Sequence, residues 1–133
     1  MRARTDAECQ VEVWRDGVET RMYASAATGA RQLTVFEQWC APGHGAPSHI
    51  HAVEELLRIV AGEAEVWVDE DRERVTAGAN VLIPAGAIHG FRNTGDGTLQ
   101  VLAILAEPIF EARYLDPERD VRRWPRPSGA STR

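Results

Sequence analysis

The sequence has few cysteines and no long apolar run, and each shortage excludes a class of protein. Its two cysteines, Cys9 and Cys40, lie far apart, so they form neither a CxxC pair nor the framework of a disulfide-rich domain. No apolar stretch reaches the roughly 20 residues of a membrane-spanning helix. The opening residues, MRARTDAECQ, are polar and mixed in charge, unlike a signal peptide. We therefore expect a cytoplasmic protein that does not bind membranes.

A surplus of basic residues is also lacking. The chain carries 15 basic and 20 acidic residues, a net charge of −5, whereas nucleic-acid-binding domains are usually basic. We expect no nucleic-acid partner, and a small molecule instead. A length of 133 residues with 44% hydrophobic content suits one domain, covering residues 1–133, that can bury a core of its own.

Short strands separated by turns are the main pattern along the chain. Residues 10–14 alternate polar and apolar side chains, 31–40 are rich in β-branched and aromatic residues, and 99–105 are almost entirely apolar. Glycine or proline interrupts the chain about every 10 to 15 residues, which favours a sandwich or barrel. Residues 107–114 fit either a short helix or an edge strand, and 125–133 read as a frayed tail. The sequence predicts an all-β fold.

Two of the four histidines stand one residue apart, in the segment SHIHAVEE. On a strand, His49 and His51 would point to the same side, and Glu55 has the same parity. His89 follows a turn that contains proline and glycine, and a barrel could bring it beside the first pair. Imidazole and carboxylate ligands suit divalent transition metals. Spacing alone leaves both a metal site and a polar strand end open.

The spacing of these residues resembles both halves of the cupin signature. In the first half, a glycine, the HxH pair, a glutamate and a second glycine follow one another at the family's intervals. In the second half, a glycine, a PxG turn, a histidine and an asparagine do the same. The matching positions are Gly43, His49, His51, Glu55 and Gly62, then Gly78, Pro84, Gly86, His89 and Asn93. They place one motif at 43–62 and the other at 78–93.

The resemblance implies a double-stranded β-helix, or jelly-roll barrel, with short N-terminal strands and a short C-terminal extension. It also implies that His49, His51, Glu55 and His89 bind one divalent metal ion: iron, manganese, nickel, zinc, cobalt or copper. The ligands do not choose among these ions. His44 matches no position of the signature.

The same metal cradle supports several functions. We expect an oxygen-dependent, dioxygenase-like enzyme for a small organic molecule, with a non-redox isomerase, epimerase or lyase and a binding protein without turnover as alternatives. No catalytic residue is assigned. Cys40 precedes the first motif and could approach the site. Thiol dioxygenases usually lack the glutamate ligand, and Glu55 is present here, so we do not expect that chemistry. Six residues are candidates for the pocket: Phe36, Gln38, Trp67, Phe91, Phe110 and Tyr114.

Open sheet edges predict an oligomer. A jelly roll leaves edge strands that need covering, and residues 10–14 and 19–24 could pair with a neighbouring chain. Together with the habit of cupins, this favours a homodimer.

Overall fold

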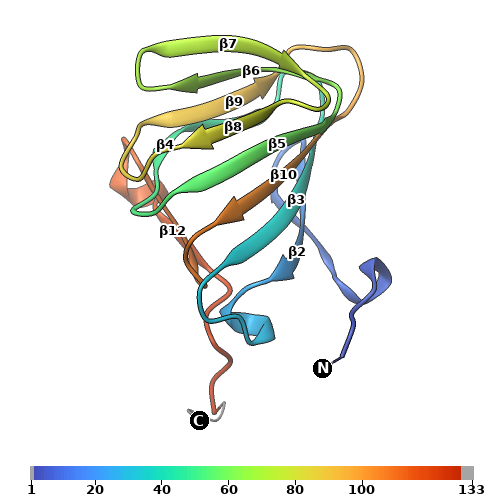
Figure 1. Ribbon diagram of the computed structural model, residues 1–133, viewed down its shortest axis with the longest axis vertical. Helices are drawn as coiled ribbons and strands as arrows, with labels where there is room; N and C mark the ends of the chain where they lie inside the picture. The colour runs from blue at the N-terminus through green and yellow to red at the C-terminus, as the bar shows by residue number, and fades with distance from the viewer. Residues whose placement is uncertain (1, 130–133) are drawn as a thin grey trace.

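A computed structural model describes residues 2–129 and shows two antiparallel sheets of six strands that face each other (Figure 1). The first sheet has the order β1 (Val11–Arg15), β2 (Val18–Ala24), β3 (Thr34–Cys40), β10 (Leu99–Leu105), β5 (Glu55–Ala61), β8 (Asn80–Ile83). The second has the order β12 (Val121–Arg123), β11 (Phe110–Tyr114), β4 (Gly45–Ile50), β9 (His89–Asn93), β6 (Glu63–Val68), β7 (Asp71–Thr76). The all-β jelly-roll prediction is confirmed.

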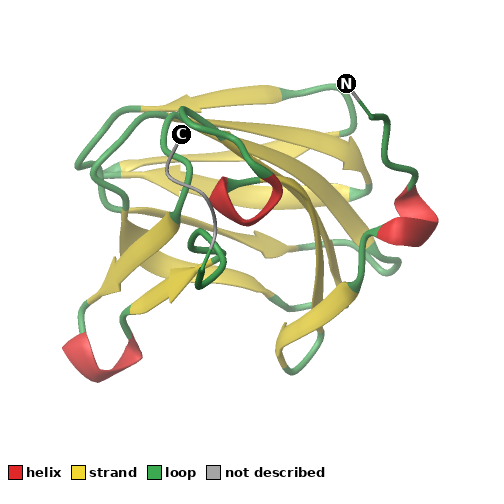
Figure 2. Cartoon of the chain, turned by 90° about the horizontal axis from the view of Figure 1, so that it is seen from below, coloured by secondary structure: helices red, strands yellow, loops and turns green. Residues whose placement is uncertain are grey.

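Short 3₁₀ turns are the helical elements of the described chain. They are η1 (Asp6–Glu8), η2 (Ala26–Thr28) and η3 (Pro117–Arg119), and they lie outside the two layers of strands (Figure 2). Between residues 2 and 129 there is no helix with the length and apolar character to cross a membrane.

The core lies between the sheets, and every second residue of β10 is part of it. Leu99, Val101, Ala103 and Leu105 are all buried, while the residues between them are partly exposed. The apolar run 99–105 was predicted to be a core strand, and the structure confirms it. β10 pairs with β3 on one side and with β5 on the other, so it lies within its sheet, where its buried face packs against the core.

The ambiguous segment 107–114 forms a strand. In β11, Phe110 and Ala112 are buried while Glu111 and Arg113 are exposed, which is the period of two that a strand requires. After β12, residues 125–129 form no strand. The predicted frayed tail extends over 130–133, which lie outside the described residues.

A β-bulge in β1 changes which residues face the barrel interior. The register with β2 shifts between Val13 and Arg15, so Trp14 is an extra residue in the ladder. A bulge of this kind re-aims the side chains around it. Trp14 and Arg15 consequently both line the interior cavity, whereas Val11 and Val13 are 44% and 71% exposed.

Candidate metal centre

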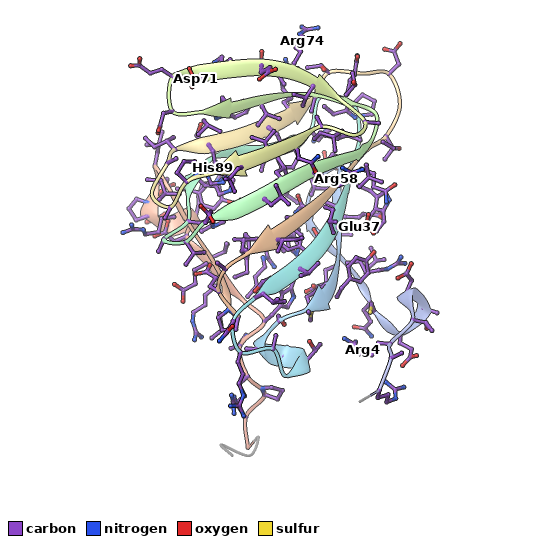
Figure 3. All side chains as sticks on the ribbon, in the orientation of Figure 1. Arg4, Glu37, Arg58, Asp71, Arg74 and His89 are labelled. Carbon is purple, nitrogen blue, oxygen red and sulfur yellow. The ribbon has the colours of Figure 1, made fainter. Side chains whose placement is uncertain are left out.

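Four side chains from three strands and one loop meet between the sheets. His49 lies near the end of β4, His51 follows that strand, Glu55 begins β5 and His89 begins β9. All four residues are buried, and their ligand atoms lie within 4.8 Å of one another. Figure 3 shows His89 between the two sheets, while Asp71 and Arg74 lie on the outlying β7. The barrel therefore collects all four residues of the predicted ligand set at one point.

The turn of the second motif is tied to the first motif through the backbone. Gly86 has φ +81°, a conformation that favours glycine, and its N–H donates to the carbonyl oxygen of His51 at 2.9 Å. Asn93 fixes the other end, because its Nδ2 donates to the carbonyl oxygen of Cys40 at 3.0 Å. Gly86 and Asn93, two positions of the second motif, thus hold the backbone on either side of the ligands in place.

Each imidazole is oriented by a backbone carbonyl at its Nδ1 atom. A carbonyl oxygen can only accept a hydrogen bond, so each Nδ1 carries the proton and each Nε2 is left as an acceptor. The three pairs are His49 with Pro47 at 2.6 Å, His51 with Glu111 at 2.6 Å and His89 with Ala87 at 3.0 Å. This is how histidine ligands are usually held to a metal.

The inward-facing atoms are all acceptors. Nε2 of His49 lies 3.2 Å from Nε2 of His51. Glu55 Oε1 lies 3.3 Å from Nε2 of His51 and 3.1 Å from Nε2 of His89. Lone pairs packed this closely repel unless a cation or an additional proton lies among them. Three imidazole nitrogens and one carboxylate oxygen fit a divalent transition metal.

Burial and mutual proximity set the charges of these groups. Burial, with the neighbouring His89 and His51, lowers the pKa of His49 to about 3. Burial opposes ionisation of Glu55, but His51 and His89, which can donate to its carboxylate when their rings are doubly protonated, outweigh it and lower that pKa to about 2. Burial also opposes protonation of His51, and the contact with Glu55 overcomes it and raises the pKa. At neutral pH, His49 is thus a neutral ligand and Glu55 an anionic one.

The four ligands line one small, mostly apolar cavity. Its volume of about 20 Å³ is space for one water molecule or ion. Five of the six predicted pocket residues line it: Phe36, Gln38, Phe91, Phe110 and Tyr114. Gln38 is buried and donates from Nε2 to Thr20 Oγ1 at 3.0 Å. Tyr114 also borders two surface pockets, so its ring stands between the cavity and solvent.

Trp67 lies elsewhere, although the sequence interpretation placed it in the pocket. It alternates in β6 with the buried Val66 and therefore points to the other face of the strand. Its Nε1 donates to Ser48 Oγ at 2.8 Å, and the guanidinium of Arg72 lies 5.0 Å from its ring centroid.

The two residues without a predicted role also lie outside the cavity. The ring of His44 packs against Gly17. Cys40 is fully buried, and burial raises the pKa of its thiol to about 11. A thiol with so high a pKa is a poor nucleophile at neutral pH.

Comparison with known proteins identifies the family. The model of the "Cupin domain" family matches residues 37–105, which hold β3 to β10 and all four ligands. The chain belongs to the cupin family. Among curated proteins, this cupin is 39% identical over 81 residues to Protein SchB of Streptomyces halstedii, covering 60% of this chain and 54% of that one. It is 28% identical over 93 residues to auxin-binding protein 1 of Arabidopsis thaliana, covering 63% and 47%. The cupin thus spans about half the length of these relatives.

Solved structures share the fold over longer stretches. The polyketide cyclase RemF of Streptomyces resistomycificus has a TM-score of 0.71 at 21% identity, covering 88% of this chain and 89% of that one. The oxalate decarboxylase of Lactobacillus farciminis has a TM-score of 0.73 at 22% identity, covering 82% and 34%. An RmlC-like cupin of Shewanella frigidimarina has a TM-score of 0.68 at 20% identity, covering 79% and 88%.

Two residues on the cavity wall of this cupin had no signal in the sequence. Trp14 and Arg15 reach the interior because β1 is bulged. A strand without the bulge would have turned them to opposite faces. Leu57 lies two residues after Glu55 in β5, on the same face, and it also lines the cavity.

Proposed function

We propose that this cupin is a metal-dependent enzyme that converts a small enolic or phenolic compound with consumption of dioxygen. The observation that carries the proposal is the position of the ligands: all four form part of the wall of a cavity. Structural metal sites are closed by protein ligands, whereas catalytic sites keep an open position for water or substrate. A five- or six-coordinate ion held by these four residues would keep one or two such positions open.

The residues around the site define what it can do. When bound, a divalent ion supplies a positive charge that polarises a substrate oxygen, and a redox-active ion also supplies an electron for reaction with dioxygen. Phe36, Phe91 and Phe110 line the same cavity and exclude water, which strengthens electrostatic interactions there. Apart from the ligands, Trp14, Arg15, Gln38 and Tyr114 are the hydrogen-bonding side chains of the wall, and they would orient the substrate.

A non-redox reaction, in which the ion acts only as a Lewis acid, is the second candidate. The similarity to a polyketide cyclase over nearly the full length of both chains favours it. Cyclisation of a polyketone proceeds through enolates, and a cation beside the carbonyl oxygen stabilises them.

Turnover with and without oxygen separates the two candidates. Metal-free protein would be reloaded separately with Fe²⁺, Mn²⁺, Ni²⁺, Co²⁺, Cu²⁺ and Zn²⁺ and mixed with a panel of phenols and 1,3-diketones. Oxygen uptake and product mass would be recorded in air and under argon. The proposal expects uptake coupled to substrate loss, abolished in His51→Ala and retained in His44→Ala, whose ring lies outside the cavity.

Each other outcome has a definite meaning. Conversion that continues under argon would replace the oxygen-dependent reaction with the Lewis-acid one. A compound that binds the metal-loaded protein and is recovered unchanged with every ion would show a binding protein without turnover.

A further inference from the structure

Three arginines surround a surface pocket next to the metal cavity. The pocket has a volume of about 210 Å³, and its walls include the guanidinium-bearing side chains of Arg15, Arg119 and Arg123 together with the rings of Trp14 and Tyr114. No aspartate or glutamate is among its lining residues. Although the protein has a net charge of −5, this pocket is positively charged and has aromatic rings in its walls.

Each of the three arginines is held by something other than a carboxylate. Nε and Nη2 of Arg15 both donate to the carbonyl oxygen of Gly45, at 2.9 and 2.6 Å. Arg123 stacks on Trp14 with its guanidinium carbon 4.1 Å from the ring centroid, and Arg119 lies 5.9 Å from that of Tyr114. Over residues 2–129, none of the three arginines forms an ion pair.

The carboxylates near the pocket are already engaged. Burial lowers the pKa of Arg123 and the nearby Glu12 raises it, but Oε2 of Glu12 accepts a hydrogen bond from Trp124 Nε1 at 2.8 Å. Oδ1 of Asp120 accepts from the backbone N–H of Tyr114 at 2.8 Å. The guanidinium groups therefore keep donors that these carboxylates do not satisfy.

The arrangement costs free energy in the absence of an anion. Burial lowers the pKa of Arg15, and the positive charges of Arg123 and Arg119 lower it further. Nε of Arg123 is a buried donor without a hydrogen-bond partner, and such donors are rare in folded proteins. Groups held at a cost beside a cavity indicate a binding function, and an anion in the pocket would relieve the repulsion among the three arginines.

The arginine pocket adjoins the metal cavity directly. Trp14, Arg15 and Tyr114 line both spaces. The ring of Tyr114 lies 5.6 Å from the ring of His49. Pro47 lines the arginine pocket, and its carbonyl oxygen accepts the hydrogen bond from Nδ1 of His49. A molecule held at the arginines is thus about one aromatic ring away from the ligand set.

We propose that the arginine pocket binds the carboxylate of the substrate, which is a planar aromatic or enolic carboxylate whose reacting oxygen reaches the metal cavity past Tyr114. A carboxylate matches the planar, two-pronged donor geometry of a guanidinium, and the aromatic walls match a conjugated ring. This assignment rests on the proposed enzyme function for the substrate's fate, but the binding of the carboxylate can be measured on its own.

Calorimetry on the metal-free protein tests the anion site without any turnover. The probes are benzoate, salicylate, the neutral analogue benzamide, and inorganic phosphate. Arg119→Gln and Arg123→Gln remove one guanidinium each, and the exposed position of Arg119 makes the first variant harmless to folding. Arg122→Gln is the matched control, because Arg122 is adjacent in β12 and pairs with Glu111 instead.

The proposal expects benzoate and salicylate to bind and benzamide to bind at least about tenfold more weakly. Each of Arg119→Gln and Arg123→Gln should raise the Kd for benzoate about tenfold, Arg122→Gln should leave it unchanged, and added salt should weaken binding. Equal binding of benzoate and benzamide, or an equal loss in Arg122→Gln, would overturn it. Tighter binding of phosphate than of benzoate would overturn the assignment to a carboxylate.

The two proposals fail in different ways. If carboxylates bind as expected but no metal-loaded form converts any of them, the anion site stands and the enzyme proposal fails. If turnover occurs with neutral phenols and kcat/KM is the same in Arg119→Gln and Arg123→Gln as in the wild type, the enzyme proposal stands and the anion site fails.

Discussion

Nε2 of His49 and Nε2 of His51 lie 3.2 Å apart, and both are hydrogen-bond acceptors. Their protons are on Nδ1, where backbone carbonyl oxygens accept them. With both rings neutral, no N–H therefore lies between the two nitrogens. Only a cation, or protonation of one ring, makes this contact favourable, and a metal ion does so while keeping both rings in the geometry that their carbonyl partners impose.

The first prediction concerns metal content and stability. We expect about one equivalent of a transition metal per chain by elemental analysis, lost in the double variant His49→Ala/His51→Ala and kept in His44→Ala. Because the ion binds the folded state, metal at 100 times its Kd should stabilise the metal-free protein by about 2.7 kcal/mol, seen as a rise in Tm. A wild-type protein that takes up no metal even after reconstitution would refute the site.

The second prediction concerns the pH dependence of the metal-free protein. The pKa of His49 is about 3 in the folded protein and 6.5 in the unfolded chain. Below pH 6.5 the unfolded chain therefore binds a proton at His49 that the folded protein does not bind. His49 alone should therefore lower the free energy of unfolding by about 1.4 kcal/mol for each pH unit below 6.5. Between pH 6.5 and about 5.5 Glu55 stays ionised in both states, because its pKa falls from 4.5 to about 2 on folding.

Urea unfolding of the chelator-treated wild type and of His49→Gln at pH 6.5, 5.5 and 4.5 measures that slope. Glutamine keeps a polar side chain of similar length but does not titrate, so the variant should lose stability less steeply with acid. Parallel slopes for the two proteins would contradict the prediction.

The third prediction concerns a close approach of two strands. A Cβ at Gly45, in β4, would overlap the carbonyl oxygen of Phe91 and lie 2.9 Å from the Cα of Arg92, both in the neighbouring β9. Backbone atoms cannot move aside as a flexible side chain does, so Gly45→Ala should destabilise the protein by about 3 kcal/mol. At Gly97 nothing lies within 4 Å, so Gly97→Ala should change stability by less than about 0.5 kcal/mol. Denaturant unfolding of both variants checks the difference.

The fourth prediction is the homodimer. β1 is an edge strand of its sheet, and it exposes Val11 and Val13. We expect size-exclusion chromatography with light scattering to give twice the chain mass of 14.7 kDa, and Val13→Glu to shift the protein toward the monomer. Leu82→Glu is the control, because Leu82 is 61% exposed on β8, at the opposite edge of the same sheet. A wild type that elutes at 14.7 kDa would end this prediction.

The strands of the barrel could be predicted from the sequence where burial of one face or both faces gives a regular pattern of apolar residues. The run 99–105 coincides with β10, a central strand whose alternate residues Leu99, Val101, Ala103 and Leu105 form its buried face. Residues 107–114 were ambiguous because eight residues cover only about two turns of a helix, too few to separate the helical period from the strand period. The ligand set was implied by the resemblance to the cupin signature, and the structure brings those four residues together.

The walls of the cavity were less predictable. Trp67 was assigned by its aromatic character, although its parity with Val66 places it on the other face of β6. Arg15 could not have been found, because the bulge that turns it inward depends on the pairing of β1 with β2. Arg119 and Arg123 meet Arg15 only in the folded barrel, more than a hundred residues along the chain from it.

The hydrogen bond from Nδ1 of His51 to the carbonyl oxygen of Glu111 joins residues 60 positions apart. A nascent chain displays the HxH pair long before it contains the strand that fixes one of those rings. Until β11 docks against β4, the ring of His51 lacks the carbonyl oxygen that orients it, and the HxH pair is flexible. The complete, oriented ligand set therefore exists only after β11 has docked against β4.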